Sequence, residues 1–122
     1  MWSDKYNYYN IQHDEQFSQK LDKAIVVKGL LATKNFLQTN HQSFTNSAKL
    51  PWLDMVLVET SNGNFASSDN ENQFVNLIAI VCSKGEDIDQ KIYIDAFKKI
   101  ANTLNWKLYL EEDDDGNESI EL

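Results

Sequence analysis

Hydrophobic and polar residues alternate along this chain with two different periods, and the change of period separates expected helices from expected strands. From Asp14 to about Asn40, apolar residues recur every three or four positions, as on one face of a helix. Within this stretch, the β-branched run Ile25-Val26-Val27 and Gly29 both disfavour a helix. The pattern predicts a helix in this part of the chain and leaves open whether residues 24–31 are helix or strand.

Two later stretches, Trp52–Glu59 and Phe74–Cys82, are almost continuously apolar and are expected to be strands. Near-continuous hydrophobicity predicts central strands that are covered on most of both faces. Between them, Asn62-Gly63 is a turn signal that would fold Asn64 to Ser67 back as a short strand. Residues 41–50 are polar and are expected to form a loop.

A second helix is expected from about residue 88 to residue 104. Asp87 and Gln90, three residues apart, form a capping-box signature, and Asn105 suits the left-handed conformation that ends a helix. Short turns join this helix to the preceding strand and to residues 106–111, which predicts a right-handed parallel crossover. Its apolar stripe consists of Ile88, Ile92, Tyr93, Ala96, Phe97, Ile100, Ala101 and Leu104.

The C-terminal end is expected to be a hairpin. Residues 106–111 alternate with a period of two, which predicts a strand with Trp106, Leu108 and Leu110 on one face. Residues 118–122 alternate again beyond a Gly-Asn turn signal. The whole pattern predicts a single α+β domain over residues 1–122, with a mixed β-sheet of about four strands, two main helices and the order α-β-β-α-β-β.

An aromatic group precedes these elements, at Trp2, Tyr6, Tyr8 and Tyr9. Tyrosine and tryptophan suit interfaces because they cover a large area at a low entropic cost. Small domains also use such residues to close the core. We favour the core interpretation over partner binding.

Charge is concentrated at the C-terminal end. Of the 19 acidic residues, seven fall in the last twelve positions: Glu111, Glu112, Asp113, Asp114, Asp115, Glu118 and Glu121. Removing them leaves 12 acidic residues against 11 lysines over residues 1–110, so the net charge of −8 is −1 for the body plus −7 for the terminus. A block of like charge is a local field that selects a cationic partner or a divalent ion.

The acidic terminus partly resembles the calcium loop of an EF-hand. With Gly116 at position six of that loop, Glu111, Asp113 and Asp115 occupy positions one, three and five. Position twelve is then Leu122, where the loop requires a bidentate glutamate. Specific calcium binding is therefore not expected.

Composition and spacing argue against most other site chemistry. All 11 basic residues are lysine, and the absence of arginine weakens nucleic-acid and phosphoryl-transfer functions. His13, His41 and Cys82 cannot build a tetrahedral zinc site without carboxylates. Cys82 lies in an apolar run and is expected to be a buried hydrophobe. We therefore expect no enzymatic activity, no catalytic residue, no cofactor or metal site, and no binding of nucleic acid.

The hydropathy of the chain also bears on its location. No apolar run approaches the ~18 residues of a membrane span, and residues 1–6 lack the apolar segment of a signal peptide. We expect a cytoplasmic protein that does not enter a membrane.

In size, charge and α/β element order, the chain resembles bacterial toxin-immunity proteins of contact-dependent growth inhibition and polymorphic-toxin systems. The resemblance covers the whole chain but includes no shared motif. It implies a cytosolic protein that neutralises a cognate toxin domain, in many cases a nuclease whose phosphate-binding cleft is occupied by carboxylates. By this analogy the partner is basic, and the expected partner-binding residues are Tyr109, Glu111, Glu112, Asp113, Asp114, Asp115, Glu118 and Glu121.

A different class of binding protein fits the same features. Chaperones or adaptors for secreted effectors are also small, acidic, cytosolic α/β proteins, and they commonly work as homodimers. A chaperone would expose apolar grooves for an unfolded segment, whereas an immunity protein would bind a folded domain. The sequence leaves open whether the protein is a monomer or a homodimer.

Overall fold

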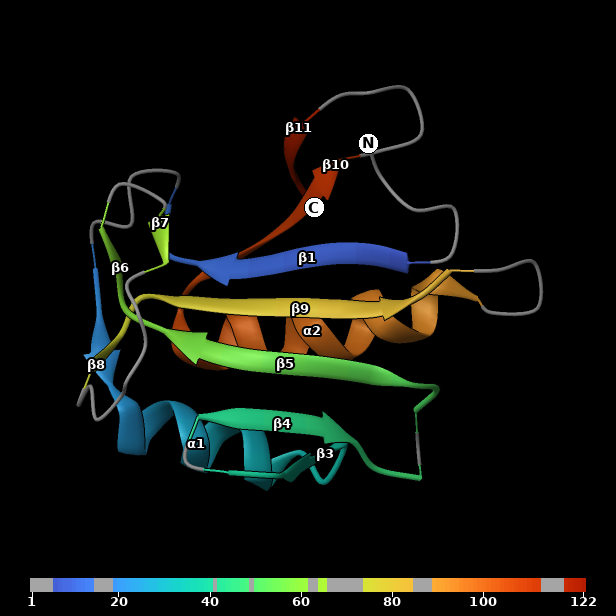
Figure 1. The fold of residues 1–122 in the computed structure, drawn as a ribbon, viewed down its shortest axis with the longest axis horizontal. Helices are drawn as coiled ribbons and strands as arrows, with labels where there is room; N and C mark the ends of the chain where they lie inside the picture. The colour runs from blue at the N-terminus through green and yellow to red at the C-terminus, as the bar shows by residue number, and fades with distance from the viewer. Residues whose placement is uncertain are drawn as a thin grey trace.

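The fold is a large antiparallel sheet with two helices on one face. The computed structural model describes residues 6–14, 19–40, 42–48, 50–61, 64–65, 74–84, 89–112 and 118–122. The strands of the large sheet are β1 (Tyr6–Gln12), β3 (Phe36–Gln38), β4 (Ser43–Asn46), β5 (Leu53–Val58), β9 (Leu77–Ser83), β10 (Lys107–Glu112) and β11 (Glu118–Glu121). They pair in the order β11-β10-β1-β9-β5-β4-β3 (Figure 1).

Two short strand pairs accompany the large sheet. One joins β2 (Leu21–Asp22) to β8 (Phe74–Val75). The other joins β6 (Thr60–Ser61) to β7 (Asn64–Phe65), on either side of Asn62-Gly63. The predicted return of the chain at Asn64 is confirmed, while residues 62 and 63 themselves lie outside the described residues.

The prediction of a mixed sheet of about four strands in the order α-β-β-α-β-β was wrong. Seven strands join one sheet, and all pairings between the described strands are antiparallel. The strand β1 was missed because asparagine, a poor strand former, interrupts its tyrosines. The strand β4 lies in the predicted loop, where Phe44 is the single large apolar residue of an otherwise polar strand. Both strands, the central β1 and the near-edge β4, carry too little hydrophobic pattern to be recognised from the sequence.

The predicted parallel crossover has another strand inserted in it. Strand β1 pairs antiparallel with β9 on one side and with β10 on the other. The strands β9 and β10 therefore run in the same direction, joined by helix α2 (Gln90–Leu104), but they are not neighbours. This is a split β-α-β arrangement, in which the N-terminal strand fills the gap.

Both helices lie behind the sheet in Figure 1, and they pack against each other. Residues 24–31, which the sequence left open, are helical and belong to helix α1 (Lys23–Ala32). This helix is much shorter than the stretch from Asp14 to about Asn40 in which a helix was predicted. Helix α2 has Asp89 as its N-cap, whose side chain accepts a hydrogen bond from the Lys91 backbone N–H at 3.0 Å. The predicted cap, Asp87, lies outside the described residues. Asn105 ends the helix at φ 60° and ψ 39°, which confirms the left-handed cap.

The helices cover one face of the sheet with an aromatic and aliphatic core. Phe97 of α2 lies at its centre, with its ring 5.3 Å from Tyr9 of β1, 5.8 Å from Tyr93 and 6.5 Å from Phe36. Ring contacts at these separations add to the free energy of burial. The predicted stripe of α2 is buried at Tyr93, Ala96, Phe97, Ile100, Ala101 and Leu104, whereas Ile92 is exposed.

Candidate functional site

The C-terminal hairpin is present and forms one edge of the large sheet. Strands β10 and β11 pair antiparallel, with Leu110 opposite Ile120 and Glu112 opposite Glu118. An ion pair of 3.7 Å joins Lys107 of β10 to Glu121 of β11, and the Leu122 backbone N–H donates to the Leu108 carbonyl at 2.8 Å. Four of the acidic positions, Glu111, Glu112, Glu118 and Glu121, therefore lie on paired strands.

The predicted partner-binding residues differ in their surroundings. Tyr109 is only 5% exposed, so its side chain is buried within the chain itself. Glu111 is half-buried and Glu121 is exposed. Glu112 and Glu118 lie opposite each other on β10 and β11. Asp113, Asp114 and Asp115 lie outside the described residues.

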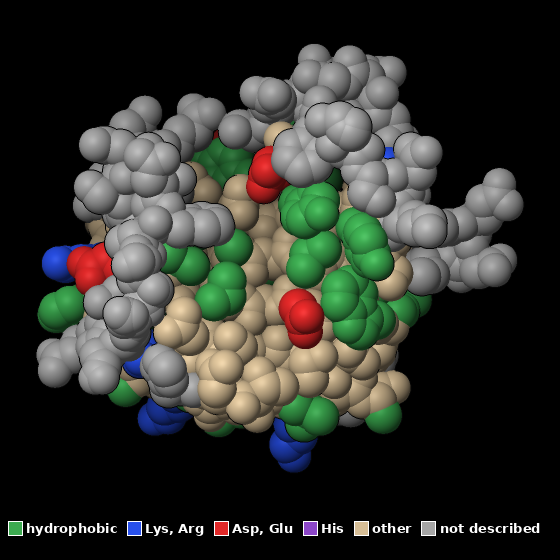
Figure 2. All heavy atoms as spheres, viewed as in Figure 1, with side chains coloured by type: hydrophobic (Ala, Val, Ile, Leu, Met, Phe, Trp, Pro, Cys, Tyr) green, Lys and Arg blue, Asp and Glu red, His purple; other side chains and the backbone are tan. Residues whose placement is uncertain are grey.

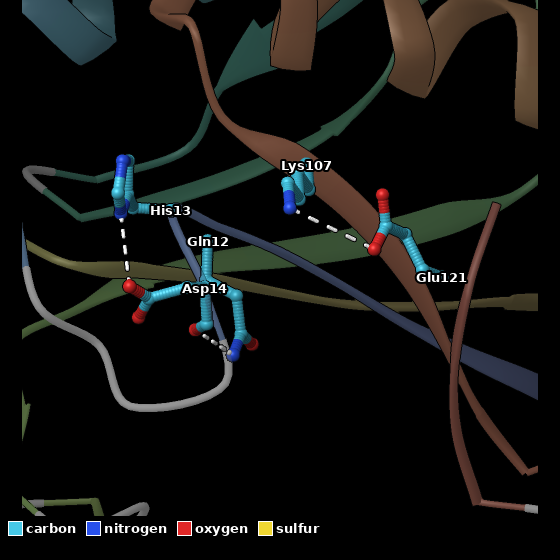
Figure 3. A network of polar contacts seen from close by, with 5 residues as sticks. All are labelled: Gln12, His13, Asp14, Lys107 and Glu121. Atoms are coloured by element: carbon cyan, nitrogen blue, oxygen red, sulfur yellow. Dashed lines mark hydrogen bonds and ion pairs between the residues drawn. The ribbon is translucent and has the colours of Figure 1, made fainter.

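A polar network lies beside this hairpin (Figure 3). The Gln12 side-chain amide donates to the Asp14 carbonyl at 2.7 Å, and the His13 Nδ1 atom lies 3.2 Å from the Asp14 carboxylate. Gln12 is the β1 residue paired with Lys107, which in turn reaches Glu121. These contacts position the end of β1 and the start of β10 relative to the acidic edge.

The face of the sheet opposite the helices holds a groove of about 710 Å³. Apolar side chains of three central strands form its floor, and polar side chains border it. Figure 2 shows this face, with hydrophobic side chains gathered on it and single carboxylates among them. The lining includes Tyr8, Val56, Ala79, Val81, Asp54 and Glu111.

Register places these side chains in rows across the strands. Tyr8 of β1 pairs with Val81 of β9, which pairs with Asp54 of β5. In the next row, Ala79 of β9 lies between Asn10 and Val56. Since side chains alternate between the two faces of a strand, both rows face away from the helices. The groove is therefore a property of the sheet register, built from strands that are far apart in sequence.

The open face corrects an expectation from the sequence. The two most apolar strands, β5 and β9, were expected to be covered on most of both faces. On the groove side, however, Val56, Ala79 and Val81 are only half-buried and Asp54 is exposed. Apolar strand residues that are left partly in water are typical of a surface that meets another molecule.

The charge of the groove has one sign. Among its described lining residues, both charged side chains are carboxylates, Asp54 and Glu111. Glu111 belongs to β10, so the groove continues directly into the acidic hairpin. Asp54 is farther away, in the centre of the sheet. From the sequence, the carboxylates Asp54 and Glu59 were interpreted as solvated strand-edge residues, and Asp54 was not among the predicted partner-binding residues.

An exposed aromatic pair borders the groove at the end where β1 begins. The rings of Tyr6 and Trp52 lie 5.7 Å apart, and the side chains are 39% and 42% exposed. The Ser83 backbone N–H donates to the Trp52 carbonyl, and Ser83 also pairs with Tyr6. These three residues therefore form a further row beside Tyr8, Val81 and Asp54. The core interpretation of the N-terminal aromatics holds for Tyr9, which is buried, but not for Tyr6.

The titratable groups on the helix-covered face are held in their neutral forms. Burial raises the pKa of the Cys82 thiol from 9.0 to about 12. Burial also raises the pKa of the Tyr9 phenol, with smaller contributions from Cys82 and Tyr93. Cys82 is buried, as predicted, and a thiol that stays protonated is a poor nucleophile. This cluster is suited to packing.

The hydroxyl groups of Tyr9 and Tyr93 are hydrogen-bonded within the protein. The Gln90 carbonyl oxygen accepts hydrogen bonds from the Asn7 amide at 2.9 Å and the Tyr9 hydroxyl at 3.0 Å. The Gln90 amide donates to the Ser83 carbonyl, and the Tyr93 hydroxyl donates to the Trp52 carbonyl at 2.6 Å. These bonds connect α2 to β1, to β9 and to Trp52, the residue that precedes β5, and thereby hold these strands against the helix.

Within the described part of the chain, no three histidine, cysteine or acidic side chains gather closely enough to hold a metal ion. The described helices include none with the length and apolar character needed to cross a bilayer. Comparisons with models of protein families, with curated proteins and with solved structures found no match. The acidic hairpin and the groove beside it are therefore the features of the described residues that bear on function.

Proposed function

We propose that this protein binds a folded, basic protein domain through its acidic hairpin and thereby neutralises a cognate cytotoxic domain, of nuclease type, in the cytoplasm. The observation that carries the proposal is the placement of acidic positions on paired strands β10 and β11 at the edge of the sheet. A nuclease needs a cationic cleft to hold phosphates, and carboxylates on a paired edge have the complementary charge.

An ordered edge supports recognition better than a loose tail would. Positions held by backbone pairing lose less conformational entropy on binding than positions in a flexible segment. The exposed Glu121 and the half-buried Glu111 lie on opposite strands of this edge. A concentrated negative field also raises the rate of association with a cationic partner and makes that rate depend on salt.

The proposal is tested by mixing the protein with the product of the neighbouring gene and measuring association rate, affinity and neutralisation. Replacing Glu112, Asp113, Asp114 and Asp115 by alanine is expected to lower the association rate at low salt by about tenfold or more. It should also flatten the dependence of that rate on salt. If affinity and salt dependence both stay unchanged, the hairpin is not the interface.

A control variant separates local from total charge. Asp22→Asn, Glu59→Gln, Asp89→Asn and Asp95→Asn together remove four negative charges away from the hairpin. If this variant slows association as much as the hairpin variant does, net charge governs binding and the local proposal fails. Asp89 caps α2, so its contribution to folding is checked by thermal unfolding of the variant.

The groove favours one alternative, an acidic chaperone or adaptor for a secreted effector. Its floor of Val56, Ala79 and Val81 is apolar and partly exposed, as expected of a surface that holds an unfolded segment. The two functions differ in what is bound and in oligomeric state. A homodimer by size-exclusion mass that binds an unfolded effector segment, and that leaves toxicity unchanged, would favour the chaperone.

A further inference from the structure

We propose that the groove receives a segment of the basic partner and that an arginine side chain of this segment pairs with Asp54 and stacks on the Tyr6–Trp52 pair. This inference rests on the proposed function, because it takes the partner to be a basic protein. It adds a second contact region, separate from the hairpin, and names the side chain recognised there.

The surroundings of Asp54 are unusual for a carboxylate in a central strand. Its cross-strand neighbours are Val81 and Thr45. No described residue forms a hydrogen bond or ion pair with the Asp54 side chain. Aspartate is among the poorest strand formers, and here no contact within the described chain offsets that cost. A cationic group from another molecule would supply the missing partner.

The aromatic pair lies one row away from this carboxylate. Trp52 precedes Asp54 by two residues on the same face, which corresponds to roughly 7 Å along an extended chain. Tyr6 reaches Trp52 across the small side chain of Ser83. A guanidinium group fits this arrangement better than an ammonium group does, because it stacks on aromatic faces while its edge binds a carboxylate.

The groove is too wide for one basic side chain to neutralise both of its carboxylates. Glu111 on β10 and Asp54 on β5 are separated by β1 and β9, and three strand spacings amount to roughly 14 Å. Asp54 therefore recognises its own cation, while Glu111 acts with the hairpin. Between them, Tyr8 and Val81 form an apolar floor suited to the uncharged part of the bound segment.

Charge identifies the occupant as another molecule and not a second copy of this chain. The protein has a net charge of −8 and contains no arginine. Two copies meeting through this face would bring carboxylates into an apolar interface without a guanidinium to pair with them. A basic partner brings the complementary charge to Asp54.

The test uses a pentapeptide, acetyl-Gly-Val-Arg-Val-Gly-amide, titrated into the ¹⁵N-labelled protein to millimolar concentration. Amide shifts are expected at residues 6–10, 53–56 and 79–83. The same peptide with citrulline, which is neutral and similar in shape, should bind at least about threefold more weakly. Asp54→Asn is expected to raise the dissociation constant of the arginine peptide about fivefold, the effect of losing an exposed ion pair. Trp52→Leu should raise it about threefold, because the cation loses its aromatic face.

The matched control is Asp95→Asn, which removes the same charge from an exposed position on α2. It should leave the dissociation constant unchanged, and the amide spectra report whether each variant is folded. Equal binding of the arginine and citrulline peptides, or unchanged binding by Asp54→Asn, overturns the proposal. Shifts that depend on protein concentration without peptide also overturn it, because a second copy then fills the groove.

Failure of this inference can be distinguished from failure of the proposed function. If the hairpin variant no longer neutralises the toxin while Asp54→Asn neutralises it fully, the groove assignment fails and the proposed function stands. If the peptide binds at Asp54 and no toxin is neutralised, the groove assignment stands and the proposed function fails.

Discussion

The two faces of the large sheet are built from the same strands and have different environments. On one face, Ile78 and Ile80 of β9 pack under the helices and are buried. On the other face, Ala79 and Val81 of the same strand are half-buried and line a groove. Hydrophobicity alone does not separate the two faces, since both rows are apolar. The difference lies in what surrounds each face. Two helices cover one face, whereas carboxylates and an exposed aromatic pair border the groove on the other.

This comparison indicates how the open face can carry a function. Apolar residues that the helices cover contribute to the free energy of folding. Equally apolar residues on the groove side contribute less to folding and remain accessible for binding. Asp54 lies on the groove side of the sheet, at a strand position where a good strand former would stabilise the fold more than aspartate does.

The largest effect should come from truncating neighbouring residues of β9 on opposite faces. Ile80→Ala is expected to lower the free energy of unfolding by about 2–5 kcal/mol, because it leaves a cavity under the helices. Val81→Ala is its control on the groove side and should cost less than about 1 kcal/mol. Urea denaturation of both variants measures the difference. Equal losses would mean that the groove side is as closely packed as the core.

A smaller effect is expected at high pH, and it should involve the helix-covered face. Burial raises the pKa of Cys82 to about 12, so the folded protein keeps a proton that the unfolded chain loses near pH 9. The stabilising contribution is complete below pH 9 and is lost as the pH rises from 9 toward 12. One such group lowers the free energy of unfolding by about 1.4 kcal/mol per pH unit.

Cys82→Ala removes this contribution and should make the loss of stability between pH 9 and 11 less steep. Urea denaturation of both proteins at several pH values provides the measurement. The variant also loses some free energy of unfolding at pH 7 because its side chain is smaller, and this constant difference is subtracted at every pH. An unchanged slope would show that the thiol does not titrate differently in the folded and unfolded states. The raised pKa values of Tyr9 and Tyr93 leave a residual slope in the variant.

The smallest effect concerns stability on the groove side. Asp54→Thr is expected to raise the free energy of unfolding by up to about 1 kcal/mol, because threonine is a good strand former and aspartate a poor one. The same variant should bind the arginine peptide more weakly. Asp95→Thr in α2 serves as the control and should change stability little, since the two residues have similar helix propensities. A loss of stability in Asp54→Thr would mean that the carboxylate serves folding.

Strong periodic patterns predicted parts of the fold correctly. Helix α2, its left-handed cap at Asn105 and the two apolar strands are present close to the expected positions. The C-terminal hairpin is also present, because alternation on both sides of a turn signal is a local property. The strands β1, β3 and β4 were missed, since their stability comes from cross-strand neighbours that a linear pattern does not identify.

The candidate site could be predicted only in part for the same reason. The acidic edge is contiguous in sequence and was recognised from charge alone. The groove unites residues of β1, β5, β9 and β10, and only the register brings Tyr8, Val81 and Asp54 into one row. Tyr109 was proposed as a surface anchor from its position beside the acidic residues, but it is buried. Tyr109 pairs with Asn10 on the groove side of the sheet, the same face as Glu111, so a position on an open face does not by itself make a side chain accessible.

The insertion of β1 between β9 and β10 has a consequence for how the chain matures on the ribosome. Tyr9 and Ile11 leave the ribosome about 100 residues before their partners in β10 do. At typical synthesis rates, β1 waits roughly 5–20 s before its second partner exists. Pairings between such distant segments also slow folding itself. The domain is therefore expected to fold as one cooperative unit once β10 and β11 have been synthesised, and its binding face is complete only then.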